Sequence, residues 1–146
     1  MKKLLLMIAM LYTVATQAQL EIGASLAGQT KTTYDDVSIF EAPDERVVSD
    51  VAPSLVAFVE YDFVKLDFYK ASLVTVAQIG QYDQNVDAGV RLGLDMLNFT
   101  LLTKGGGFGS TFGISEKINL NLSYYSRWKS RIEEIETFGI GLSIKL

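Results

Sequence analysis

The feature that most constrains this fold is a strict two-residue alternation that recurs along much of the chain. It is clearest over residues 138–146, FGIGLSIKL, where each large hydrophobic residue is followed by glycine, serine or lysine. Side chains that alternate in this way lie on opposite faces of an extended strand. We therefore expect a strand with two unlike faces. Its apolar face carries Phe138, Ile140, Leu142, Ile144 and Leu146.

Seven further segments read as strands bounded by turn residues. The eight predicted strands cover residues 20–29, 52–61, 68–80, 86–97, 98–104, 108–114, 118–128 and 138–146. The second and third are the least regular. The connections are expected to alternate between short ones and longer or more polar ones. No segment has the 3.6-residue period of an amphipathic helix.

The small residues on the polar faces of these strands indicate which side of the sheet faces outward. Glycine weakens a strand and gains nothing on a face exposed to water. It suits a crowded, concave interior, and an eight-stranded barrel has a lumen that side chains can fill. The sequence therefore predicts an all-β, closed, antiparallel up-and-down transmembrane β-barrel of about eight strands. The glycines concerned are Gly23, Gly89, Gly93, Gly109, Gly113, Gly139 and Gly141.

Charged residues on the same faces as these glycines are predicted to form ion pairs in the lumen. Buried charges need partners of opposite sign, and both signs are present. A solvated charged face is the alternative. In this interpretation the apolar face of residues 138–146 contacts lipid. The lumen candidates are Glu21, Asp87, Arg91, Asp95, Lys104, Arg127 and Lys145.

Residues 1–18 are predicted to be a secretory signal peptide. Two lysines precede an apolar core over residues 4–14, and small residues stand before a cleavage site at Gln19. An uncleaved N-terminal anchor is the alternative. The barrel domain would then comprise residues 19–146. Because sheets can span a membrane only as closed barrels, the predicted destination is the outer membrane of a Gram-negative cell.

Composition excludes several kinds of chemistry. The chain has no histidine and no cysteine, so Ser-His-Asp sites, Cys-His sites and histidine zinc ligands are ruled out. Its formal net charge of −4 argues against nucleic-acid binding, which requires a concentrated basic face. No cofactor and no metal site are expected.

Three motifs have simpler interpretations than the functional ones they suggest. The glycines of residues 105–109, GGGFG, are predicted to form a tight turn rather than a phosphate-binding loop, because no Lys-Ser/Thr follows. The acidic stretch 31–50 is expected to be a surface loop, with calcium binding as the alternative. Glu133 and Glu134 are adjacent, so on an extended chain they face opposite ways and are poorly placed for paired carboxylate catalysis.

Taken together, residues 118–128 (INLNLSYYSRW), residues 138–146 and the preceding FGSTFGISEK resemble small eight-stranded outer-membrane β-barrel proteins of the OmpX-like and PorT-like class, as does the signal ending TQAQ. The resemblance implies that the last strand is recognised by the outer-membrane assembly machinery, usually through a terminal aromatic residue, where this chain has Leu146. It also implies a barrel closed to solutes with a structural, adhesive or protective role. The lipid-modifying enzymes among such barrels depend on histidine, which this chain lacks.

The predicted function is that of a non-enzymatic, monomeric integral outer-membrane protein with a filled lumen. Its partners would be outer-membrane lipid, the assembly machinery and an extracellular partner that the sequence does not identify. Any specific activity would lie in the surface loops, chiefly 31–50 and 129–135. Two alternatives stay open: a secreted soluble β-barrel carrier of a small apolar ligand, and a barrel enzyme with carboxylates at its mouth.

Overall fold

The structure is a computed structural model that describes residues 19–34 and 46–146. The predicted signal peptide and residues 35–45 of the predicted acidic loop lie outside the described residues. Within the described part of the chain, no helix is long and apolar enough to cross a membrane.

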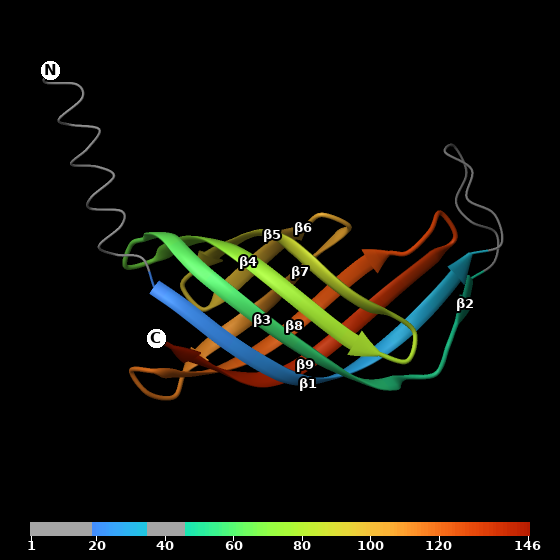
Figure 1. The fold of residues 1–146 in the computed structure, drawn as a ribbon, viewed down its shortest axis with the longest axis horizontal. Coiled ribbons are helices and arrows are strands. Elements are labelled where there is room, and N and C mark those ends of the chain that lie inside the picture. The colour runs from blue at the N-terminus through green and yellow to red at the C-terminus, as the bar shows by residue number, and fades with distance from the viewer. Residues whose placement is uncertain (1–18, 35–45) are drawn as a thin grey trace, which may run out of the picture.

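Eight antiparallel strands close into a barrel (Figure 1). Each strand pairs with the next along the chain, and β1 closes the circle by pairing with β9 from Glu21↔Lys145 to Thr33↔Glu133. The predicted fold class is therefore confirmed. The strands are β1 (Gln19–Tyr34), β2 (Arg46–Val48), β3 (Ala52–Lys65), β4 (Tyr69–Gly80), β5 (Gln84–Leu94), β6 (Leu97–Leu102), β7 (Gly105–Gly113), β8 (Ile118–Trp128) and β9 (Glu133–Lys145).

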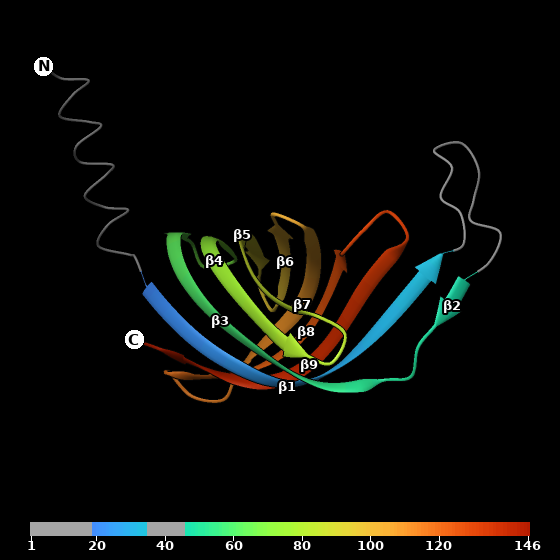
Figure 2. The ribbon, with the colours of Figure 1, turned by 45° about the vertical axis from the view of Figure 1, so that its right-hand side comes forward.

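The ninth strand, β2, lies outside the closed circle and was not predicted. It pairs with the far end of β1, from Thr32↔Val48 to Tyr34↔Arg46. Figure 2 shows β1 running toward β2 at the end of the barrel away from the C-terminus; we call this the β2 end. β2 is only three residues long, Arg-Val-Val, so it is too short to show an alternation that could have revealed the extra strand.

The connections do not alternate in length as expected. Those formed by residues 66–68, 81–83, 95–96, 103–104, 114–117 and 129–132 are all turns of four residues or fewer. Such turns occur at both ends of the barrel because antiparallel neighbours need only a tight hairpin to connect them. Among the connections between barrel strands, only the one that contains β2 is long.

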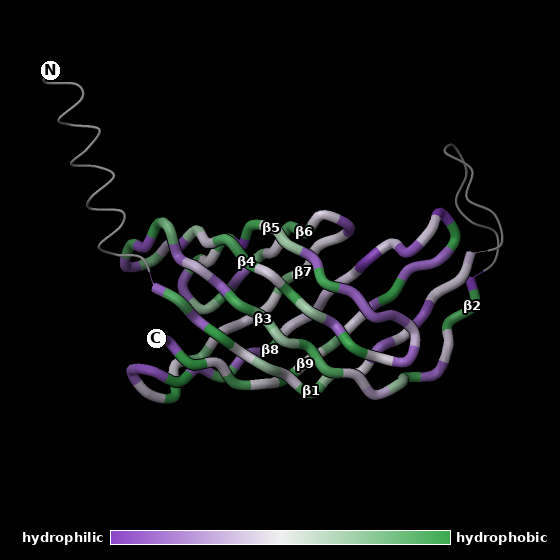
Figure 3. Tube along the Cα trace, viewed as in Figure 1, coloured by the Kyte–Doolittle hydropathy of each residue, from purple (hydrophilic) through white to green (hydrophobic). Residues whose placement is uncertain are grey.

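The wall of the barrel has most of its large hydrophobic side chains outside and many polar ones inside. Hydropathy alternates along much of the chain (Figure 3). The five apolar side chains of residues 138–146 are 51–69% exposed, whereas Glu21, Glu60 and Arg91 are 5% exposed or less. Among the described residues, buried polar side chains outnumber buried hydrophobic ones.

Residues 105–109 form the beginning of β7, so the predicted tight turn there is wrong. The turn lies at residues 103–104 instead. None of the described glycines has a positive φ. Gly107 is needed for close approach, because a Cβ on it would overlap the backbone carbonyl oxygen of Tyr124 in β8.

Candidate functional site

The interior of the barrel is organised around Arg91, which projects inward from β5. Its guanidinium donates hydrogen bonds to Glu60 (2.5 Å), the Tyr125 hydroxyl (2.8 Å) and Thr100 (3.0 Å). It also lies over the Phe58 ring, 4.9 Å from the centroid. All five side chains are buried. The charge of Arg91 is thus balanced by a carboxylate and an aromatic face, as a buried cation requires.

Lys70 on β4 supplies the second cation of this layer. Its ammonium lies 2.7 Å from Glu60, 3.8 Å from Asp62 and 3.9 Å from Glu21. The Ser72 hydroxyl lies within hydrogen-bond distance of both Glu60 (2.8 Å) and Asp62 (2.7 Å). Three carboxylates therefore share two cations, which gives the layer a dense network of opposite charges.

Hydrogen bonds extend this layer around the barrel. Glu21 on β1 accepts from Asn119 (3.0 Å) and from Ser143. From Ser143 the network continues across β8, β7 and β6, with distances of 2.7–3.2 Å, through Asn121, Thr111 and Asn98. Every one of the eight barrel strands contributes a side chain to this network, which we call the polar belt. It ties the wall together from inside.

An apolar layer lies next to the polar belt. It consists of Val56, Phe58, Val74, Val76 and the Tyr125 ring, all buried inside the barrel. The sequence had indicated glycines and ion-paired charges in the lumen and gave no indication of this layer. The layer explains why the second and third predicted strands looked irregular, because β3 and β4 are apolar on both faces over this stretch.

A second polar cluster lies nearer the β2 end. The Arg127 guanidinium binds Asp83 and lies 3.1 Å from Asp87, which also accepts a hydrogen bond of 2.8 Å from Thr103. In the same part of the interior, Thr137 donates to Gln78 at 3.1 Å. The apolar layer is therefore bordered by charged groups on both sides.

The structure brings together four of the predicted lumen residues in these layers: Glu21 and Arg91 in the polar belt, Asp87 and Arg127 in the second cluster. Lys145 is half-buried and borders a polar recess with Glu21 at the C-terminal end of the barrel. The expected inward position does not hold for the remaining two. Asp95 and Lys104 are exposed in the turns 95–96 and 103–104. The predicted strands included both positions, whereas β5 and β6 end before them.

Asp95 also has the one positive φ among the described non-glycine residues, 53°. Aspartate tolerates this left-handed conformation better than most residues. Its position thus reflects the needs of a two-residue hairpin turn rather than an ion pair in the lumen.

Four charged residues of the interior networks were missed from the sequence: Glu60, Asp62, Lys70 and Asp83. Glu60 and Asp62 have the same parity as Val56 and Phe58. Because the apolar layer hid the alternation of β3, the inner face of that strand could not be read. Every second residue from Ser54 to Asp62 lies on the same face of β3. The polar residues at both ends of this series are the signal that could have found Glu60 and Asp62.

At the β2 end, the adjacent carboxylates Glu133 and Glu134 contact different neighbours. Lys31 lies 2.6 Å from Glu133. Glu134 accepts hydrogen bonds from Tyr34 (2.9 Å) and Ser126 (2.5 Å). The pair is not arranged for joint acid–base chemistry. Over the described residues, no group of three or more carboxylates is placed to hold a metal ion.

Comparison with known proteins gives few matches. No family model matches the chain, and no curated protein matches it. Two solved structures of Ail, the attachment invasion locus protein of Yersinia pestis, are 12% identical to it and cover 88% of this chain and 99% of their own. The one in complex with the heparin analogue sucrose octasulfate has a TM-score of 0.49, and the other has 0.43. Likeness at this level is too weak to inform function.

Proposed function

We propose that this chain is a non-enzymatic integral outer-membrane β-barrel protein. Its lumen is filled by side chains, and its role is structural or one of surface interaction through the loops at the β2 end. The single observation that carries the proposal is the inverted wall. Charged and amide side chains are buried inside a closed barrel, while large hydrophobic side chains such as Leu26, Leu101 and Leu142 are more than half exposed.

The free energies involved favour a membrane over water. A soluble protein rarely exposes a continuous apolar surface of more than a few hundred Å², yet here every strand of the barrel carries exposed large hydrophobic side chains. In hydrocarbon the exposure of this apolar surface carries no free-energy cost. Because the barrel is closed, its sheet has no edge with unpaired backbone groups. Strands of 11–16 residues, such as β8 and β1, are long enough to cross when tilted.

The filled lumen is supported by the polar belt and the apolar layer beside it. Together they place side chains from every strand across the interior, in a barrel size that leaves room for little else. The β2 end is assigned to the outside of the cell because it carries the one long connection, and outer-membrane barrels have their longer loops there. β2 extends the sheet beyond the barrel on this side.

Cell fractionation with surface proteolysis tests the proposal. The protein should sediment with outer membranes, migrate differently on a gel before and after boiling, and be cut from outside only in the connection that contains β2. Full solubility without detergent would overturn it. Binding of a fatty acid by detergent-free protein would favour a soluble carrier instead.

A further inference from the structure

The apolar layer crosses the lumen from wall to wall. In the circle of barrel strands, β4 lies opposite β8 and β6 lies opposite β1. Val74 and Val76 on β4 belong to one buried cluster with the Tyr125 ring from β8, and Leu102 on β6 and Ala27 on β1 pack against it. The first three side chains are 3% exposed or less. The layer therefore closes the cross-section through contacts between facing walls.

Two of the strands between these walls carry glycine where they meet the layer. Gly89 on β5 is the direct cross-strand neighbour of both Val74 and Leu102, and Gly107 on β7 is that of Tyr125. A Cβ on either glycine would overlap a backbone carbonyl oxygen of an adjacent strand. Closure consequently depends on a few bulky side chains, because the glycines have none to contribute.

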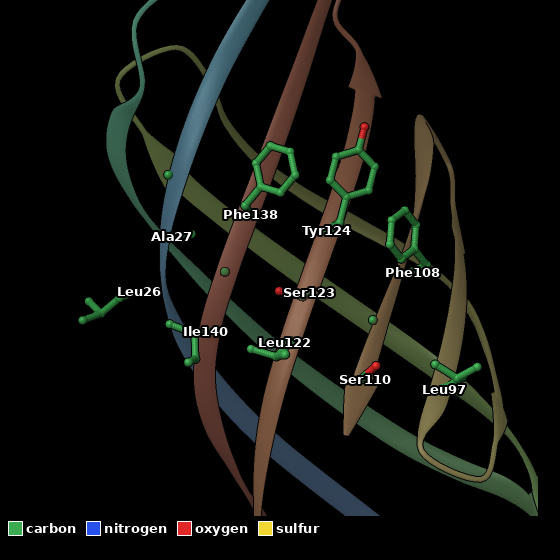
Figure 4. Close-up of a pocket in the computed structure, with 13 residues that line it drawn as sticks. Leu26, Ala27, Leu97, Phe108, Ser110, Leu122, Ser123, Tyr124, Phe138 and Ile140 are labelled. Atoms are coloured by element: carbon green, nitrogen blue, oxygen red, sulfur yellow. The ribbon is translucent and has the colours of Figure 1, made fainter. Parts of the chain in front are cut away.

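The wall beside Ala27 is also made of small residues, and Figure 4 shows part of it. Ala27, Gly139, Ser123 and Gly109 follow one another as direct cross-strand neighbours on β1, β9, β8 and β7. Their parity directs them toward the lumen, whereas large side chains drawn there, such as Phe138, lie on the outer surface. Shortening the side chains of the layer would therefore leave a gap that this wall cannot fill.

The polar groups on either side of the layer are more accessible to ions than the layer itself. A recess of about 190 Å³ opens at the C-terminal end of the barrel and is lined by polar-belt residues such as Asp62, Asn98 and Thr111. The second polar cluster lies on the other side of the layer. Charged and amide groups can replace part of the hydration shell of an ion, but aliphatic side chains cannot. The main barrier to an ion is therefore the apolar layer.

Each of the two polar clusters has an excess of negative charge. In the polar belt three carboxylates share two cations, and in the second cluster Asp83 and Asp87 share one. Lys65, Lys145 and Asp95 also border the recess. They are exposed or half-buried, so water screens their charges more strongly. A path through the two clusters would therefore attract cations and repel anions.

We propose that the apolar layer is a hydrophobic seal between two polar clusters, and that the pathway it closes selects cations. This rests on the proposed function, since it requires a barrel that spans a membrane. In channels, carboxylate side chains select cations, and hydrophobic constrictions close a pore by excluding water. The interior of this barrel combines both elements. The alternative is that the ion pairs themselves shut the lumen.

Conductance of the full-length mature protein in planar bilayers tests the proposal. The parent should be silent. The triple variant Val56→Ala, Val74→Ala, Val76→Ala shortens the layer, and we expect it to show stepwise currents and to raise K⁺ efflux from vesicles about tenfold or more. Gel mobility before boiling verifies that the variant is folded. If the triple variant does not fold, Val76→Ala alone should raise K⁺ efflux in the same vesicles by a smaller factor.

The matched control shortens outward side chains on the same two strands. Leu55, Val59 and Leu73 lie on the outer wall of β3 and β4 and are 45–56% exposed. The triple variant Leu55→Ala, Val59→Ala, Leu73→Ala should stay silent. Currents equal to those of the layer variant would overturn the proposal, because loosening any part of the wall would then be sufficient.

Charge variants test the selectivity and the alternative closure by ion pairs. In the parent, Glu60→Gln and Asp87→Asn should stay silent. In the layer variant they should lower the permeability ratio of K⁺ over Cl⁻ from about tenfold toward unity. Parent-level efflux from the folded layer variants, currents from the charge variants of the parent, or a preference for Cl⁻ would each overturn the proposal. Channels in the parent, or its failure to insert into vesicles, would instead refute the proposed function.

Discussion

Removing Arg91 is expected to destabilise the barrel more than removing the carboxylate to which it is bound. Arg91 makes three hydrogen bonds and one ring contact. Arg91→Met keeps most of its length and removes the charge. Glu60→Gln keeps the shape of Glu60 and removes its charge, so the two variants can be compared as matched halves of one buried pair.

The magnitudes follow from the charges that remain. Without Arg91, the carboxylates of Glu21, Glu60 and Asp62 face only Lys70, an excess of two negative charges in a buried layer. Without the charge of Glu60, two carboxylates face two cations and the layer is balanced. Breaking a buried ion pair from one side costs about 3–5 kcal/mol. We therefore expect about 5 kcal/mol for Arg91→Met and about 3 kcal/mol for Glu60→Gln.

The double variant measures the energetic coupling between Arg91 and Glu60. Once Arg91 is gone, removing the charge of Glu60 relieves part of the excess, so the double variant should cost about 2 kcal/mol less than the sum of the single ones. The assay is equilibrium urea unfolding in phospholipid vesicles, followed through Trp128, the only tryptophan in the chain. A larger loss for Glu60→Gln than for Arg91→Met, or strict additivity, would refute this account of the polar belt.

Three further outcomes are expected. Leu142→Arg, on the outer wall, should cost about 2–4 kcal/mol in vesicle unfolding if it faces mid-bilayer, whereas Ile114→Arg, in a turn, should cost less than about 1 kcal/mol; equal costs would count against lipid contact. Gly107→Ala should lose about 1–3 kcal/mol through overpacking, and Gly113→Ala, whose Cβ would have its nearest neighbour at 3.9 Å, should change stability little. In planar bilayers the folded protein should show no stepwise ion current; resolved channels would disprove a filled lumen.

Much of the fold could be predicted from the chain alone, and particular strands show why. β8 has the bounds that the sequence predicted, Ile118–Trp128, because its outer face is apolar and its inner face polar over most of its length. β5 was likewise predicted with the correct faces. It ends at Leu94 rather than three residues later, since alternation continues into a turn without any change in composition.

The interior networks could be predicted only in part. Parity placed Glu21, Asp87 and Arg91 inside, because each stands among glycines or small residues on a well-patterned strand. It could not assign partners, since Arg91 binds Glu60 from a strand 31 positions earlier in the chain. Nor could it detect β2, which is stabilised by pairing with β1 and carries no periodic signal of its own.

The sequence by itself determined that the chain forms strands, that their faces are unlike, and which face of most strands turns inward. Period-two alternation and the placement of glycine are local properties, so no knowledge of neighbouring strands is required to interpret them. Only the tertiary structure decided which charges meet and where the apolar layer lies. Those features depend on the register between strands, which follows from closure of the whole barrel and is not specified by any single segment.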